Sequence, residues 1–176
     1  LIFVENPGSN TFEMQDLGKV VSLGKSKNNR SQILEPVIMP ILAPYNNYSN
    51  NQSISNGNIF SLNRETSLSQ WESGPRINYG LNWLVNNDDL TVNTSFGQSA
   101  KIKKDSTTEI SNYFIGNILD FGNIGYIKSD ITIDRHDLYL KDNNINSSLN
   151  FDKIKFGFDY DYETSNKIKT SEQISI

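Results

Sequence analysis

The stretch RINYGLNWLV, from Arg76 to Val85, shows most directly how this chain folds. Every second residue from Ile77 to Val85 is apolar, and the residues between them are polar or glycine up to Asn82, with Leu84 as the exception. Side chains two positions apart point to the same face of a β-strand, so the stretch predicts a strand with one apolar and one polar face. The turn NNDD, residues 86–89, and a second alternating segment, residues 90–97, follow directly. The two segments predict an antiparallel hairpin with a short connection.

The same alternation recurs downstream, at about residues 127–134, 144–151 and 154–163. A helix would spread the charges of these segments over its apolar side, so strands are favoured. Two segments alternate less clearly. Residues 112–122 are apolar at both parities, which predicts a bulged strand or one packed on both sides. Residues 33–44 carry Pro36, Pro40 and Pro44, which predicts an edge or irregular strand.

The predicted strands differ sharply in how they are connected. With the stretches near Val20 and Ile174 included, we count roughly nine strands of about 9–11 residues, enough to cross a hydrocarbon layer when tilted. A long polar loop at about 45–74 is followed by the short turn at 86–89, then by a long and a short connection. This sequence of connections favours a membrane barrel, with tight turns on one side and extended loops on the other.

The composition excludes several classes of protein. Only 36% of the 176 residues are hydrophobic, the formal net charge is −4, and there is no cysteine. Without a dense block of Lys and Arg, nucleic-acid binding is not expected. No run of about 18 apolar residues predicts a transmembrane helix, but alternating strands keep hydropathy low, so a barrel stays open. The chain begins at Leu1, and we expect it to be an internal fragment.

Residues able to carry catalysis are scarce. The single histidine, His136, has no second histidine or cysteine to share a transition metal with, so no metal site is expected. Asp159, Asp161 and Glu163 share one face of one strand, where a polar lumen or water explains them. No nucleophile elbow, phosphate-binding loop or zinc-protease motif is present. The sequence therefore predicts no enzyme and no cofactor.

Several elements around the opening strand match a known family in order and spacing. Glu35 and Pro36 lie in a predicted strand that ends at Ala43 and Pro44, and a long connection then leads into Tyr-Gly-Leu. Over about residues 32–83 these elements resemble the C-terminal barrel domain of the LPS-assembly protein LptD family. The matching residues of the connection and strand mouth are Asn58, Phe60, Asn63, Arg64, Trp71, Glu72, Gly74, Arg76, Tyr79 and Gly80.

The resemblance implies a fold, a location and partners. Residues 1–176 would be part of an all-β, antiparallel up-and-down transmembrane β-barrel in the Gram-negative outer membrane, contributing roughly nine strands to a larger barrel. Such barrels deliver lipopolysaccharide to the outer leaflet and are not enzymes. The implied partners are lipopolysaccharide, an LptE-like lipoprotein plug, outer-membrane lipids, and a periplasmic LptA-like bridge that docks on an N-terminal domain outside this chain.

On this interpretation the polar parity lines the lumen and the apolar parity meets lipid. The lipid-facing residues would include Ile77, Leu81, Trp83, Phe156 and Phe158, and Glu72 would pair with Arg76 to pin the loop at the strand mouth. Two other functions fit the same alternation: a soluble or surface-anchored β-sandwich used for binding, and a porin-like diffusion barrel. The lumen-facing candidates are Asn78, Asn82, Asn93, Lys128, Asp130, Lys155, Asp159 and Asp161.

Overall fold

The described part of the chain consists of β-strands and connections, with one helical turn. The structure is a computed structural model that describes residues 15–16, 19–20, 23–27, 30–45, 53–65, 71–151, 154–165 and 168–175. Among these residues no helix is long and apolar enough to cross a membrane. The elements are β1 (Gln15–Asp16), β2 (Lys19–Val20), β3 (Leu23–Lys27), β4 (Arg30–Leu42), β5 (Arg76–Asn87), β6 (Leu90–Ile102), β7 (Thr108–Ile110), β8 (Tyr113–Asp120), η1 (Gly122–Ile124), β9 (Gly125–Ile133), β10 (Leu140–Phe151), β11 (Ile154–Ser165) and β12 (Ile168–Ser175).

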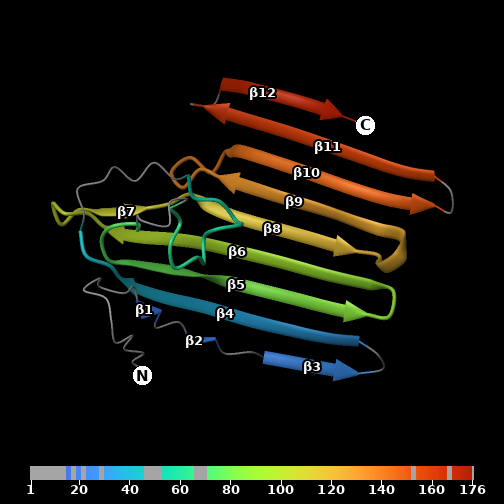
Figure 1. The fold of residues 1–176 in the computed structure, drawn as a ribbon, viewed down its shortest axis with the longest axis horizontal. Helices are drawn as coiled ribbons and strands as arrows, with labels where there is room; N and C mark the ends of the chain where they lie inside the picture. Colours follow the sequence, from blue (N-terminus) through green and yellow to red (C-terminus); the bar gives the residue numbers. More distant parts are fainter. Residues whose placement is uncertain are drawn as a thin grey trace.

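All the described strands belong to one antiparallel sheet, which confirms the predicted all-β class. The strand order is β1-β4-β5-β6-β8-β9-β10-β11-β12, so nine strands follow one another across the sheet; β2 and β3 also pair with β4, and β7 pairs with the end of β6 (Figure 1). The sheet is open: no described strand pairs with the outer side of β12. Asp88 and Asp89 alone join β5 to β6 at one end, whereas residues 43–75 join β4 to β5 at the other.

The proline-rich strand β4 is regular on one side and interrupted on the other. Its register with β5 is unbroken from Ser31 opposite Asn86 to Ile41 opposite Arg76. On its other side the described pairs with β1, β2 and β3 pass over Pro36 and Pro40. A proline nitrogen has no hydrogen to donate, and a spacing of four directs both nitrogens to the same side of the strand. The prediction of an irregular strand is right for that side and wrong for the β5 side.

Strand β8 is regular, so the predicted bulge is wrong. It pairs with β6 and β9 without a register shift, and the shifts lie instead near Leu140 in β10 and Glu163 in β11. Two apolar residues lie on its polar face. Phe114 is only 3% exposed because the connection between β4 and β5 covers it, whereas Ile118 is 40% exposed. The connection therefore explains the apolar residue at Phe114 but not the one at Ile118.

Burial is inverted relative to a water-soluble sheet. The buried apolar side chains of the described residues are Ile41, Ala43, Ile59 and Phe114, and they lie where that connection meets the polar face. The apolar face has no second layer among the described residues, and Trp83 and Phe156 are 42% and 53% exposed on it. Among the described residues the core therefore lies under the connection, and the broad apolar face is uncovered.

Candidate functional site at the docked connection

The connection between β4 and β5 contains a tight turn that lies over β5, β6, β8 and β9 (Figure 1). The backbone N–H groups of Asn58 and Ile59 donate to the carbonyl oxygen of Ser55, at 3.2 and 3.0 Å. The Asn58 side chain closes the turn: its Oδ1 accepts from the Ser55 N–H at 2.9 Å, and its Nδ2 donates to the Ser53 carbonyl at 3.1 Å. Asn forms such local bonds readily, so this residue shapes the turn.

Two paired glycines receive the apolar side chains of this turn. Gly80 and Gly97 are direct cross-strand partners on the polar face of β5 and β6. A Cβ atom at Gly97 would lie 3.1 Å from both Cγ atoms of Ile59, and one at Gly80 would lie 2.7 Å from Cζ of Phe60. Ile59 is fully buried in this position. Only glycine leaves the turn room to approach the sheet this closely.

The tip of the turn is bonded to more distant strands through Asn56. Its Nδ2 donates to Oδ1 of Asp130 on β9 at 3.0 Å, and its Oδ1 accepts from the Ser95 hydroxyl on β6 at 2.8 Å. Between them, a Cβ atom at Gly116 of β8 would lie 2.0 Å from the Asn56 Nδ2. One side chain therefore bonds the connection to β6 and β9 and passes close over β8 between them.

A buried charge cluster fixes the base of the connection. Arg64 donates to both carboxylate oxygens of Glu72 through Nε and Nη2, and both side chains are almost completely buried. Arg76 Nη2 and Lys101 Nζ approach the same carboxylate, at 3.6 and 3.7 Å. Arg76 also donates to the Leu62 carbonyl. The two-pronged Arg64 contact is the strongest geometry for such a pair.

The Glu72 carboxyl is held in its charged form. Burial alone would raise its pKa, but the hydrogen bond from Arg64 and the charges of Arg64, Arg76 and Lys101 outweigh that effect and lower the pKa below its ordinary value. The Glu72 backbone N–H also donates to Oδ1 of Asn63 at 3.0 Å. A cluster of three cations around one carboxylate depends on that carboxylate staying charged.

The mouth of β5 is closed by a glycine and a tyrosine. Gly74 has φ +85°, a conformation that favours glycine, and its N–H donates to the Pro44 carbonyl at 3.2 Å. A Cβ atom there would lie 2.8 Å from the ring of Tyr45. The Tyr45 hydroxyl reaches the carbonyl oxygens of Ile102 and Lys103, at 3.2 and 3.1 Å. The connection is thus tied to the end of β6 as well.

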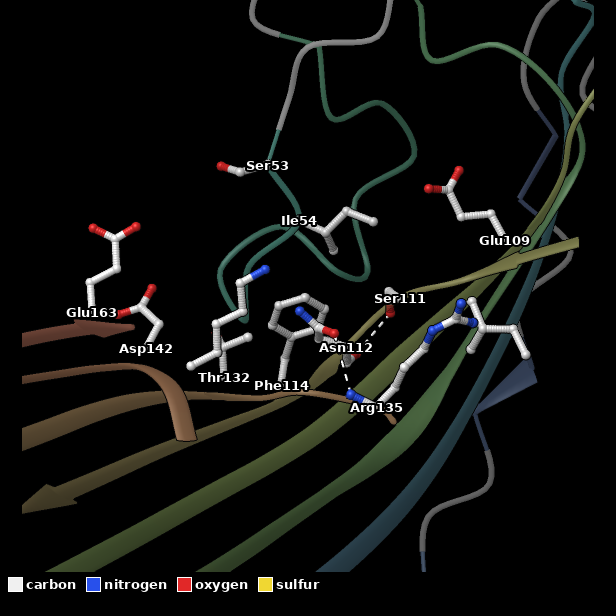
Figure 2. A pocket seen from close by; sticks show the side chains of 12 residues that line it. Ser53, Ile54, Glu109, Ser111, Asn112, Phe114, Thr132, Arg135, Asp142 and Glu163 are labelled. Atoms are coloured by element: carbon white, nitrogen blue, oxygen red, sulfur yellow. Dashed lines mark hydrogen bonds between the residues drawn. The ribbon is translucent and has the colours of Figure 1, made fainter. Parts of the chain in front are cut away.

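A cavity of about 610 Å³ lies beside the docked turn, with Ser53 and Ile54 forming one wall (Figure 2). Figure 2 shows Phe114 below Ile54, and Asp142 together with Glu163, which are cross-strand partners. Arg135 lies on the other side of Phe114 from that carboxylate pair. Both signs of charge line the cavity, so it suits a polar ligand.

Across the described parts of the chain, no group of His, Cys, Asp or Glu side chains is gathered to hold a metal ion.

The predicted site residues divide between the two faces of the sheet. Tyr79 lies on the apolar face, where its hydroxyl donates to Oε1 of Gln98. The other nine residues of the loop and strand-mouth motif belong to the connection or to the polar side of β5. Glu72 does approach Arg76, but its principal partner is Arg64. His136 is exposed in the turn after β9.

The strand register places all eight lumen-facing candidates on the polar face. Asn78 differs from the others because the connection covers it: it is 0% exposed, and its Oδ1 accepts from the Ser99 hydroxyl at 2.7 Å. Asp159 and Asp161 accept hydrogen bonds from Asn146 and Asn144 across β10 and β11. The acidic residues of β11 are therefore partners of a polar ladder.

Some residues of the site have no counterpart in the sequence-based prediction. Asn56 and Ile59 lie in a stretch without a periodic pattern, and nothing in the sequence distinguishes them from their neighbours. Gly97 and Gly116 did carry a signal, because glycine inside a strand often marks a close approach of another segment. Lys101 enters the cluster only because it is the cross-strand partner of Arg76.

Fold and site together define a class of protein: an all-β antiparallel sheet with one exposed apolar face, whose longest described connection is docked on the polar face. Comparisons with protein-family models, curated proteins and solved structures found no match to this chain.

Proposed function

We propose that this chain is part of the wall of a transmembrane β-barrel, with its apolar face toward lipid and its polar face toward a lumen. The inverted burial carries the proposal. Exposing a broad apolar face to water is unfavourable, whereas the outer surface of a membrane barrel is an apolar band. Leu81, Trp83 and Phe158 are 37%, 42% and 37% exposed on that face, while Arg64 and Glu72 are buried on the other.

The strand lengths are consistent with a membrane crossing. β5, β10 and β11 contain 12 residues each. At about 3.4 Å per residue such a strand is roughly 40 Å long. Tilted by about 45°, it spans roughly 28 Å, close to the ~30 Å hydrocarbon core of a bilayer.

We further propose that the barrel lies in the Gram-negative outer membrane and delivers lipopolysaccharide to the outer leaflet. The resemblance to the LptD family supports this step, since most of the residues that carry it meet at the docked connection. On this proposal an LptE-like lipoprotein fills the lumen and an LptA-like bridge supplies the lipid from the periplasm. The polar ladder of Asn144, Asn146, Asp159 and Asp161 would then face saccharide or the plug.

Site-specific photocrosslinking tests the proposed transport. A photoreactive side chain is placed at Asp159 on the polar face or at Phe158 on the apolar face, in cells that assemble the full protein. We expect lipopolysaccharide to crosslink at Asp159, and bulk phospholipid to crosslink at Phe158. Equal crosslinking of lipopolysaccharide at both positions, or none at either, would contradict the proposed route.

A further inference from the structure

A row of polar side chains crosses the apolar face near the middle of β8 and β9. Thr94, Asn117 and Ser129 are direct cross-strand partners on β6, β8 and β9. The adjacent rows on the same face are entirely apolar on these three strands. They consist of Phe96, Ile115 and Ile131 on one side and Val92, Leu119 and Ile127 on the other. The polar row is therefore enclosed by apolar side chains.

This row has hydrogen-bonding capacity left over. The Thr94 hydroxyl donates to Oδ1 of Asn117 at 3.0 Å. Within the described residues, the Asn117 amide NH₂ and the Ser129 hydroxyl have no side-chain or backbone acceptor. This step rests on the proposed function: in a membrane barrel these groups face hydrocarbon, where an unpaired polar group is costly. Polar side chains within a membrane usually mark a contact with protein.

The chemistry of the row favours a copy of itself as the partner. It is uncharged, so it does not select a charged partner. A primary amide both donates and accepts, and so does a hydroxyl, so the row is self-complementary. It is also nearly symmetric, with a hydroxyl on each side of the central Asn117. Isologous two-fold contacts require this kind of self-complementary surface.

We propose that a second copy of this chain docks on the row, with a two-fold axis along the membrane normal passing through Asn117. This axis leaves both copies in the same orientation relative to the membrane. It brings the Asn117 amides of the two copies together; because the strands are tilted, the two rows cross at this point, with Thr94 and Ser129 of each copy on either side of the amide pair. The flanking apolar rows then pack around the hydrogen-bonded centre.

Single cysteines test the contact, because this chain has no cysteine of its own. Asn117→Cys is compared with Phe158→Cys, which lies on the same face three strands away on β11. A disulfide needs Cα atoms within about 7 Å. In membranes containing the full protein under mild oxidation, we expect a disulfide-linked dimer for Asn117→Cys only, with the unsubstituted protein as the control.

The outcomes separate this proposal from the one on which it rests. Equal dimer yields for the two variants, or crosslinking of Asn117→Cys to a protein of different mass, would overturn the homotypic contact. Quenching by brominated lipids of a fluorophore coupled to Phe158→Cys before reconstitution would support the membrane placement even then, and its absence would refute that placement. In detergent, Asn117→Leu should weaken dimerisation roughly 3- to 30-fold, and Phe158→Leu should leave it unchanged.

Discussion

Removing the charge of Glu72 should release the connection from the sheet while the strands stay folded. Glu72→Gln keeps the size of the side chain but removes the carboxylate that Arg64, Arg76 and Lys101 share. Breaking a buried ion pair by neutralising one partner costs about 3–5 kcal/mol. The cost is borne by the docked state, because Lys101 and Arg76 regain water when the connection leaves. Every 1.4 kcal/mol is a factor of ten, so the undocked population should rise by about two to three and a half orders of magnitude.

Amide hydrogen exchange measures this change directly. The N–H groups of Asn58, Ile59 and Ser61 are hydrogen-bonded within the turn, and Ile59 is fully buried, so their exchange requires the turn to open. In lipid or detergent, Glu72→Gln should speed exchange at these three amides. The rate of exchange should rise by the same two to three and a half orders of magnitude as the undocked population. The free energy of docking sets the upper limit of this rise. Amides in the middle of β5 and β6 should keep their protection.

A second salt bridge near the end of the same sheet provides the control. Glu109 lies 3.3 Å from Lys103, but both side chains are about half exposed. An exposed pair contributes about 0–1 kcal/mol, so Glu109→Gln should change exchange in the turn little. If the two Glu→Gln variants behaved alike, the buried cluster would not hold the connection. Equal loss of protection throughout the sheet would refute the assignment of the cluster to docking alone.

Three further predictions use matched positions. Gly97→Val should speed exchange in the turn without harming the sheet, because the new side chain takes the place of Ile59; Gly157→Val, whose Cβ atom would meet nothing closer than 3.8 Å, should not. Leu81→Arg, near the middle of β5, should cost about 2–4 kcal/mol in a membrane-folding assay, and Phe156→Arg, near the turn end of β11, about 0–1; equal costs would contradict the membrane placement. Because the pKa of Glu72 is lowered by docking, its contribution is complete above the ordinary pKa of 4.5 and is lost as the pH falls through the lower value; amide exchange in the turn, corrected for the intrinsic pH dependence of exchange, should then speed up only below pH 4.5, and Glu72→Gln should abolish this rise.

The two faces of the sheet were predictable because strand periodicity is a local property. Side chains alternate with a period of two wherever a segment is extended, so Asn78 and Asp159 were assigned to the same face without any knowledge of strand order. Register was not needed for that assignment, only parity. The same reasoning placed Leu81 and Phe158 on the apolar face. The position of a residue along its strand was harder to predict than the face on which it lies. Phe156, for example, is only the third residue of β11 and lies near the turn.

The docked connection was not predictable in detail because long-range contacts determine it. Asn56 bonds to Asp130, 74 positions away, and the polar stretch between residues 53 and 65 carries no periodic pattern. Glu72 and Arg76 are four positions apart, which suggested a direct pair. Arg64 has the better geometry, because its Nε and Nη2 donate to both carboxylate oxygens of Glu72. Proximity in sequence identified the cluster but not its principal bond.

The docked connection and the neighbouring cavity share residues, so a change in one affects the other. Ser53 and Ile54 supply one wall of the cavity, and the turn they begin is held by Asn56 at its tip and by Glu72 at its base. Phe114 serves both, since it lies under the connection and also lines the cavity. Anything that undocks the connection therefore removes a wall of the cavity and uncovers Asn78 and Phe114 on the polar face. A ligand that fills the cavity against Ile54 would, by the same linkage, stabilise the docked state.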